Sequence, residues 1–440
     1  MPVERARGSR RARIFHGRGG AARRRAGRGS ARRMRRRAHS VPAAWRPEPM
    51  SARRILFVEA STGGVVGGSL TGILHLIPHL DRTRFAPSLA LFEPKSIAVD
   101  GAPVHVLPPL PRRAGAAGKG TIARTVARVT NFQAVLGTRT RALGALLRRE
   151  RPALVYLANG VRANLDGVIA ARLRRVPVVC HEKALGSFGP LERLASRWID
   201  ACVCMTDEIA AHCRARRLRP RRLITIHDGI DTRRFAPGGG AAIRREFGIP
   251  ADAPLAGIVG HIQDWKGQHL VVEAVARARR RFAELRCLVV GGVHRRGVEY
   301  AAYLRERIAA PDLAGHVILT GARDDVPACL DAMDVAIHAS VVPEPFGRVL
   351  IEAMALGRAV IAPREGGPLA VVVDGETGLL VAPRDADALA DALATLLADP
   401  ARRVAMGHAG RSRVDAVFDI RHHVAAMEAL FEDVLAQGSR

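Results

Sequence analysis

Two carboxylates, Glu344 and Glu352, stand eight positions apart in the stretch EPFGRVLIE. If the stretch is wholly helical, it spans roughly 12 Å, comparable to a diphosphate with a sugar at each end. Carboxylates accept hydrogen bonds from hydroxyl groups, so the pair suits the two ends of an elongated ligand. Glutamates at this spacing are also common, and the alternative is a capping carboxylate followed by one on an ordinary helix surface.

The residues between the two carboxylates predict the start of a helix. Pro345 suits a first helical turn, where a missing N–H has little consequence, and Gly357 suits the end of the helix. Phe346 and Gly347 then lie at a helix N-terminus, whose free N–H groups and positive dipole end attract anions. We therefore expect a diphosphate between the carboxylates, with Val349 also contacting the ligand.

A lysine and two further loops point to the same ligand. Lys266, in GHIQDWKGQHLVVEAV, precedes a predicted helix and can neutralise phosphate as a point cation. It is one of only four lysines beside 65 arginines. The loop GARDDVPACLDAMD offers Arg323, Asp325 and Val326 to a base, and REGGPLAVVVDGETGLLV supplies further glycines. The expected ligand is a nucleotide diphosphate, and the expected binding set includes no metal, since no Asp-x-Asp motif lies near.

The elements that must position these residues alternate between strands and helices. Apolar runs such as RILFVEA, ALVYLA, VPVVCH and RLITIH read as strands buried on both faces, and they alternate with helical stretches. The alternation restarts at PLAGIVGHI and continues through LRCLVVGG, HVILTG, DVAIHAS and RAVIAP. The fold class is therefore α/β, with two Rossmann-like domains whose parallel sheets face one another across a cleft at the strand ends. The expected segments are 1–49 as an extension, 50–228 as the first domain, 229–252 as a linker, 253–420 as the second domain and 421–440 as a C-terminal helix that returns to the first domain.

Half of the excess positive charge lies in the first ninth of the chain. Residues 1–49 carry 16 Arg and 2 Glu, which is +14 of the net +28. Such a segment buries too little apolar surface to order itself, so we expect disorder. An over-extended start before Met50, a nucleic-acid tail, a targeting peptide and an anionic-membrane anchor all fit it. Removing the tail should abolish any nucleic-acid binding; nucleic acid is not an expected partner of the rest.

The remaining composition indicates an intracellular protein. No apolar run reaches the roughly 18 residues of a membrane span. The six cysteines lie in apolar runs without the paired spacing of a zinc site, so we expect buried reduced thiols. The predicted location is cytoplasmic, with peripheral contact at the inner face of the plasma membrane.

The order of these motifs resembles a known family. The succession HDGID, VGHIQDWKG, GARDDVPACLDAMD, EPFGRVLIEAMALGRAVIA and GGPLAVVVDGETGLLV, over about residues 224–398, resembles the C-terminal half of the retaining GT-B glycosyltransferases of family 4. The resemblance is looser in the N-terminal half, where STGGVVGGSL is similar to that family's first glycine-rich loop.

The resemblance implies roles for individual residues. Glu344 matches the glutamate near the donor sugar, Glu352 the glutamate on the ribose, and Lys266 the lysine on the diphosphate. His181, in VPVVCHEK, matches the active-site histidine, although a structural histidine at a strand end is the alternative. His261 stands where the family often has an arginine. Two first-loop glycines, which would admit a phosphate or sugar to the backbone, complete the set: Gly63 and Gly64.

The implied activity is transfer of a sugar from a nucleoside-diphosphate sugar to a glycan, lipid-linked or other acceptor, without a metal or other cofactor, in cell-surface polysaccharide synthesis. The alternative is a nucleotide-sugar epimerase on the same frame, which needs no acceptor and is separated by its products from donor alone. A nicotinamide oxidoreductase would need G-x-G-x-x-G after the first strand, and TGGVVGGS lacks that spacing. The donor sugar, the base, the acceptor, the linkage and the oligomeric state stay open.

Overall fold

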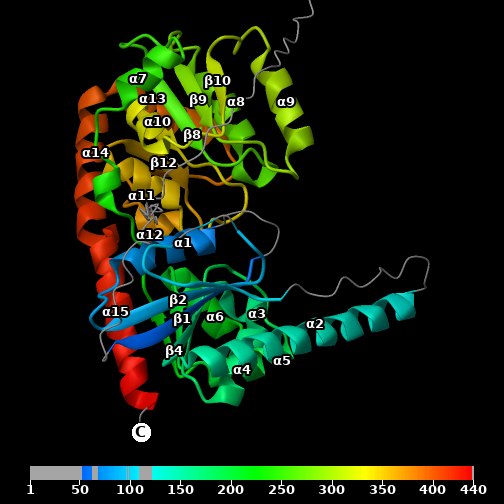
Figure 1. The fold of residues 1–440 in the computed structure, drawn as a ribbon. Coiled ribbons are helices and arrows are strands. Elements are labelled where there is room, and N and C mark those ends of the chain that lie inside the picture. The colour runs from blue at the N-terminus through cyan, green and yellow to red at the C-terminus, as the bar shows by residue number, and fades with distance from the viewer. Residues whose placement is uncertain (1–51, 62–67, 96, 98, 109–120, 439–440) are drawn as a thin grey trace, which may run out of the picture. The chain divides into compact units, whose positions relative to one another are not determined.

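The protein is described by a computed structural model for residues 52–61, 68–95, 97, 99–108 and 121–438. Figure 1 shows the arrangement of its helices and strands. The proposed extension 1–49, the start at Met50 and the loop glycines Gly63 and Gly64 lie outside the described residues.

The first sheet has seven parallel strands in the order β3-β2-β1-β4-β5-β6-β7. Its central strands are continuous apolar runs because helices cover them; Ile55 to Val58 of β1 are fully buried. The strands are β1 (Arg53–Glu59), β2 (Phe85–Leu91), β3 (Val104–Val106), β4 (Leu154–Leu157), β5 (Val178–Glu182), β6 (Ala201–Cys204) and β7 (Arg222–Thr225). The helices are α1 (Gly68–Leu76), η1 (Ile77–His79), α2 (Thr121–Glu150), α3 (Gly160–Ala163), α4 (Leu165–Arg174), α5 (Pro190–Ala195), η2 (Ser196–Trp198) and α6 (Asp207–Ala215).

The second sheet has six parallel strands in the order β10-β9-β8-β11-β12-β13. The strands are β8 (Leu255–Val259), β9 (Arg286–Val290), β10 (Val317–Gly321), β11 (Val335–Ile337), β12 (Ala359–Pro363) and β13 (Leu379–Val381). The helices are η4 (Asp264–Lys266), α8 (Gln268–Ala278), α9 (Val298–Ile308), α10 (Val326–Ala332), α11 (Arg348–Ala355) and α12 (Pro368–Val371). Two parallel sheets, each built from strands that alternate with helices, confirm the predicted α/β class. The sequence reasoning missed β13, because its three residues lie in the stretch VDGETGLLV, whose glycines and acidic residues were read as a turn.

Two segments connect or follow the sheets. The connection after β7 holds η3 (Thr232–Arg234) and α7 (Gly240–Glu246), and α7 packs on α10. The chain ends with α13 (Ala386–Ala398), α14 (Pro400–Arg413), η5 (Val414–Phe418) and α15 (Ile420–Gly438). Helix α15 packs on the first sheet: the Phe431 ring lies 6.2 Å from Phe57 and 5.9 Å from Phe85. The residue boundaries of the two domains stay predictions.

Three further sequence expectations concern the cysteines, metal ligands and membrane-spanning helices. All six cysteines are buried free thiols. Over the described ranges, no three His, Cys, Asp or Glu side chains are grouped to hold a metal ion. No described helix has both the length and the apolar character to cross a bilayer.

Candidate functional site

The turn between β11 and α11 holds both predicted carboxylates, but it is not the helical start that the sequence predicted. Helix α11 begins at Arg348, and Gly347 is its N-cap with a left-handed φ of 91°. Pro345 therefore precedes the helix, and the placement in a first helical turn was wrong. The helix does end before Gly357, whose φ is 68°. Only the second half of the span from Glu344 to Glu352 is helical, because Gly347 breaks the backbone in between.

A glycine pair from elsewhere in the chain fixes this turn. The Gly367 N–H donates to the Glu344 carbonyl at 2.7 Å. A Cβ on Gly367 would lie 2.2 Å from Phe346 Cα, and one on Gly366 would lie 2.7 Å from the Glu344 carbonyl oxygen. Because only glycine permits this approach, the Gly366–Gly367 pair holds the turn in its non-helical shape.

The Glu344 carboxylate lies among three polar side chains. Its Oε2 is 2.7 Å from Lys266 Nζ, accepts from Ser340 Oγ at 3.3 Å and is 3.8 Å from His338 Nε2. Burial opposes ionisation of Glu344, but the Lys266 ammonium and these neighbours hold its pKa below the ordinary value. Burial lowers the pKa of His338 to about 4, so this ring is neutral at neutral pH. The site therefore holds an ionised carboxylate against a lysine.

Lys266 reaches Glu344 because two strand-exit loops touch. Lys266 ends η4, and Gly267 follows it with a φ of 71°. A Cβ on Gly267 would lie 1.9 Å from the Ala339 carbonyl oxygen, so the loop after β8 presses on the loop after β11. The ammonium also lies 4.1 Å from the Trp265 ring centroid. Predicted from separate motifs, Lys266 and Glu344 come together in the structure.

The other predicted donor residues of this sheet lie at its loops. His261 is exposed, with its ring 6.1 Å from that of His294. The Arg323 guanidinium is bound to Glu246 and to Asp325, the latter at 2.7 Å. Val326 begins α10 directly after Asp325.

Arg323 thus has two acidic partners, one of which sequence reasoning missed. Glu246 lies 77 positions from Arg323, so no local pattern reveals the pair.

Two predicted residues near Glu344 are half-buried. Val349 lies on α11, and Pro345 precedes that helix.

Glu352 lies one turn into α11 and pairs with Arg348. The Arg348 Nε atom is 3.3 Å from Glu352 Oε1. Burial raises the pKa of Glu352, and Arg348 and Arg234 oppose that rise. Arg348 also acts electrostatically on Asp228, which follows β7. Sequence reasoning missed Arg348, although it lies inside the quoted EPFGRVLIE stretch.

His181 lies on β5 and is fully buried. Its Nδ1 is hydrogen-bonded to the Tyr156 hydroxyl, and its Nε2 is buried without a hydrogen-bond partner. Burial lowers the pKa of His181 well below its ordinary value, and Lys183 adds to that effect. Asp228 lies near this ring: burial opposes its ionisation, but Lys183, 3.7 Å away, and His181 hold its pKa well below the ordinary value.

The Phe346 side chain packs against residues that lie outside the second sheet. Its ring is buried and stacks 6.2 Å from His227 at an interplanar angle of 26°. The Phe418 ring lies 5.8 Å away. Because the Phe346 ring is buried against these two rings, only the backbone of Phe346 is available to a ligand. The motif HDGID, one of those that carry the family resemblance, supplies His227 and Asp228 to the site region, and neither was predicted as a site residue.

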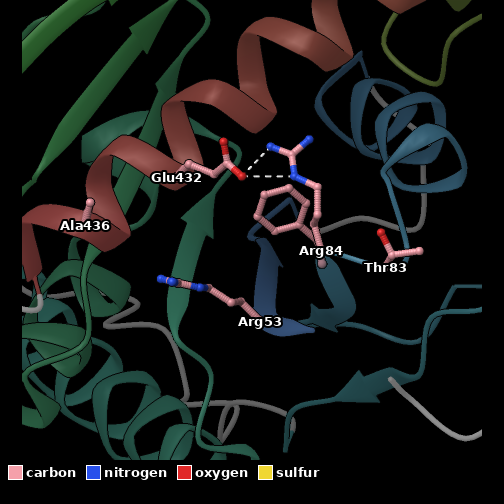
Figure 2. Close-up of a pocket in the computed structure, with 6 residues that line it drawn as sticks. Arg53, Thr83, Arg84, Glu432 and Ala436 are labelled. Atoms are coloured by element: carbon pink, nitrogen blue, oxygen red, sulfur yellow. Dashed lines mark hydrogen bonds and ion pairs between the residues drawn. The ribbon is translucent and has the colours of Figure 1, made fainter. Parts of the chain in front are cut away.

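A separate hollow of about 400 Å³ lies at the amino end of β1. Figure 2 shows Arg84 paired with Glu432 at this hollow, beside Arg53. None of the sequence-predicted residues lines it, and its main cation already has a carboxylate partner. The sequence-predicted residues Lys266, Glu344 and His181 lie elsewhere, after β8, after β11 and on β5.

Two family profiles match this chain. Residues 241–413 match the family described as Glycosyl transferases group 1. Residues 66–234 match Glycosyltransferase Family 4. The first match contains Lys266, Glu344 and Glu352, and the second contains His181.

Two curated relatives illustrate the similarity. A D-inositol 3-phosphate glycosyltransferase from Corynebacterium urealyticum is 36% identical over 192 residues, which are 42% of this chain and 45% of that protein. A 2-deoxystreptamine glucosyltransferase from Streptomyces kanamyceticus is 31% identical over 317 residues, which are 66% of this chain and 80% of that protein. The chain thus spans somewhat under half the length of the first relative.

Among solved structures, HepE from Anabaena in complex with UDP-glucose superposes with a TM-score of 0.69 at 23% identity. The superposition covers 87% of this chain and 100% of HepE. The likeness shows a common fold, and the predicted two-sheet GT-B architecture is confirmed.

Proposed function

Because the chain belongs to the glycosyltransferases of group 1 and family 4, we propose that it transfers a sugar from a nucleoside-diphosphate sugar to an acceptor hydroxyl with retained anomeric configuration. The observation that carries this proposal is the 2.7 Å pair between Lys266 and Glu344 beside the N-terminus of α11. A cation, a carboxylate and free backbone N–H groups meet at one turn, as recognition of a sugar diphosphate requires.

The chemistry follows from where charge develops. The bond between the anomeric carbon and the β-phosphate oxygen breaks, and the nucleoside diphosphate leaves with the electron pair. Lys266 and the N–H groups after Gly347 stabilise that negative charge. The acceptor oxygen bonds to the anomeric carbon from the same face, and its proton passes to the departing phosphate. No covalent intermediate on the protein is invoked.

The Lys266–Glu344 pair gives a specific binding step. A diphosphate attracts Lys266, and Glu344 then becomes free to accept hydrogen bonds from hydroxyl groups of the donor sugar. Since Lys266 and the helix N-terminus already supply positive charge, we propose that transfer needs no metal. Glu352, held by Arg348 at 3.3 Å, is the proposed ribose contact.

The acceptor is proposed more broadly. The two reported relatives act, by their names, on inositol 3-phosphate and on 2-deoxystreptamine. For this chain we propose a glycan, lipid-linked or other hydroxyl acceptor, with a cytoplasmic role in cell-surface polysaccharide synthesis. The relatives are transferases, which favours transfer over the epimerase alternative. Incubation with the donor alone should therefore give no epimer.

Peripheral contact with anionic lipid is part of the proposal. Leu191 and Leu194 of α5 are 40% and 50% exposed, and Arg193 and Arg197 beside them are exposed with no ion pair to a described acidic side chain. Exposed leucines among unpaired cations suit an anionic membrane surface. The segment follows His181 on β5, so it would hold the acceptor side of the site near lipid.

Vesicle co-sedimentation tests this contact. The Leu191→Ser/Leu194→Ser variant should lose binding to phosphatidylglycerol vesicles. Val404→Ser, which is 54% exposed on α14, is the matched control and should retain binding. Equal binding to phosphatidylcholine vesicles, or full binding by the double variant, would refute this contact.

A ligand screen tests the transferase proposal. Thermal shifts with UDP, GDP, ADP and their sugars identify the base, because a ligand that binds the folded state raises its apparent stability. The donor so identified is then incubated with candidate acceptors, and the product is examined for anomeric configuration. Stabilisation by none of these nucleotides would contradict the proposal.

A further inference from the structure

Two buried side chains on neighbouring strands, Tyr156 and His181, share one hydrogen bond whose direction decides what His181 can do. We propose that the Tyr156 hydroxyl donates to Nδ1 of His181, so that the ring carries its proton on Nε2 and acts as a fixed hydrogen-bond donor to the bound ligand. Tyr156 is thus a positioning residue. Only the identity of the ligand, a sugar oxygen, rests on the proposed function.

The backbone brings the two side chains together. Strands β4 and β5 are parallel neighbours, and Tyr156 is registered with Val179. Because side chains alternate along a strand, Tyr156 and His181 lie on the same face of the sheet. The Tyr156 ring is held by Phe57 of β1 at 5.0 Å and by Phe431 of α15 at 6.1 Å. The hydroxyl is therefore fixed on His181.

The protonation states narrow the choice of donor. Burial raises the pKa of Tyr156 and lowers that of His181, so at neutral pH the phenol is protonated and the imidazole is neutral. A neutral imidazole has one N–H donor and one nitrogen acceptor, and the hydrogen bond to Nδ1 decides which is which.

Counting unsatisfied groups decides the direction. If Nδ1 donated to the tyrosine oxygen, the buried phenolic O–H and the buried Nε2 lone pair would both lack partners among the described residues. If the phenol donates, only the Nε2–H lacks one. Buried polar groups without partners are unfavourable, so the second arrangement is preferred. The remaining Nε2–H is a donor that awaits an acceptor.

This assignment limits the role of His181. A ring nitrogen that already carries a proton has no free lone pair, so Nε2 cannot take up a second proton. His181 therefore orients an oxygen of the ligand by donation, and it is not the base for the acceptor hydroxyl. The proton of that hydroxyl then leaves through another group, which agrees with its transfer to the departing diphosphate.

The tautomer can be measured directly. Protein labelled with ¹⁵N-histidine is recorded by long-range ¹H–¹⁵N correlation at neutral pH, and the His181 signals are assigned by their loss in His181→Gln. The expected spectrum shows a protonated Nε2 and a hydrogen-bonded, unprotonated Nδ1. A protonated Nδ1 in the wild-type protein would overturn the inference. Because this readout needs no turnover, absence of sugar transfer would refute the proposed function and leave this result standing.

Variants connect the tautomer to activity. Tyr156→Phe should abolish the hydrogen-bonded Nδ1 signal and lower kcat about tenfold, with donor KM little changed, since one neutral hydrogen bond is lost. Tyr300→Phe is the matched control. The Tyr300 hydroxyl on α9 likewise lies 2.9 Å from a ring nitrogen, the Nδ1 of His269 on α8. This control variant should keep the wild-type kcat. An unchanged Nδ1 signal and kcat in Tyr156→Phe would overturn the positioning role.

Discussion

Lys266 Nζ and Glu344 Oε2 lie 2.7 Å apart although 78 positions separate them in the chain. The two side chains are 20% and 17% exposed, so the pair is largely shielded from solvent. In an ion pair of this kind, the attraction between the two charges offsets the unfavourable desolvation of each charge. A diphosphate that enters beside it competes for the lysine. In the proposed function, the pair would therefore couple the recognition of phosphate to the release of a carboxylate toward the sugar.

Replacement of Lys266 should lower both the activity and the stability of the protein. In Lys266→Ala, kcat/KM for the donor should fall about 10²–10³-fold, because one stabilising group for the leaving phosphate is gone. The unfolding free energy should also fall by roughly 1–3 kcal/mol, since Glu344 loses its partner. Steady-state kinetics and chemical denaturation measure the two effects. Arg280→Ala, which removes an exposed cation shortly after α8, is the control and should change neither.

Gly367 should be intolerant of a side chain. In Gly367→Ala, the new Cβ would meet Phe346 Cα at 2.2 Å and push the Glu344 turn away from Lys266. We expect kcat/KM to fall about 10²-fold, since such a loss can follow a misplacement of about 1 Å. Gly137→Ala on α2 is the control, because its Cβ would meet only an arginine tip at 4.0 Å. Full activity in Gly367→Ala would show that the turn can move without consequence.

Metal removal should leave transfer intact. After treatment with a chelator and exhaustive dialysis, initial rates should match those of untreated protein, because Lys266 and the α11 N-terminus supply the positive charge. Rates are compared with and without added Mg²⁺ or Mn²⁺. A loss of activity that either ion restores would contradict the metal-independent reaction.

Glu182 should make stability depend on pH. Burial raises the pKa of Glu182 from 4.5 to about 7, against opposing hydrogen bonds such as that from the Val161 N–H. Between these pH values the folded state holds a proton that the unfolded state has released, so stability falls as pH rises. The loss of folding stability amounts to about 3 kcal/mol and is complete above the folded-state pKa.

The comparison with Glu182→Gln isolates this contribution. The variant should gain stability relative to the wild type as pH rises from about 4.5 to 7, since it has no carboxyl to titrate. Denaturation curves at several pH values give the difference. A difference that does not change with pH would mean that Glu182 titrates normally in the folded protein.

The sequence predicted those parts that local pattern determines. Runs such as ILFV in β1 are apolar without alternation because both faces of a parallel strand are covered, and twelve of the thirteen described strands were placed from such runs. Lys266 and Gly267 were placed at a helix start because a strand ends just before them.

The missed features depend on contacts between distant residues. The Glu344 turn is shaped by Gly367, which lies beyond α11 and β12 in the chain, so its own residues suggested a helix instead. Tyr156 reaches His181 only because β4 and β5 are neighbours. Asp228, in the HDGID motif, was not predicted as a site residue, because its contact with Lys183 joins two segments that are distant in the chain. Single-sequence patterns carry no information about such pairings.

Binding of the diphosphate at the Lys266–Glu344 turn is best tested by a crystal structure with the nucleoside diphosphate found in the thermal-shift screen. The β-phosphate should lie within hydrogen-bonding distance of Lys266 Nζ and of backbone N–H groups after Gly347, with Glu344 turned toward the sugar position. A diphosphate bound away from this turn, with the Lys266–Glu344 pair unchanged, would contradict it.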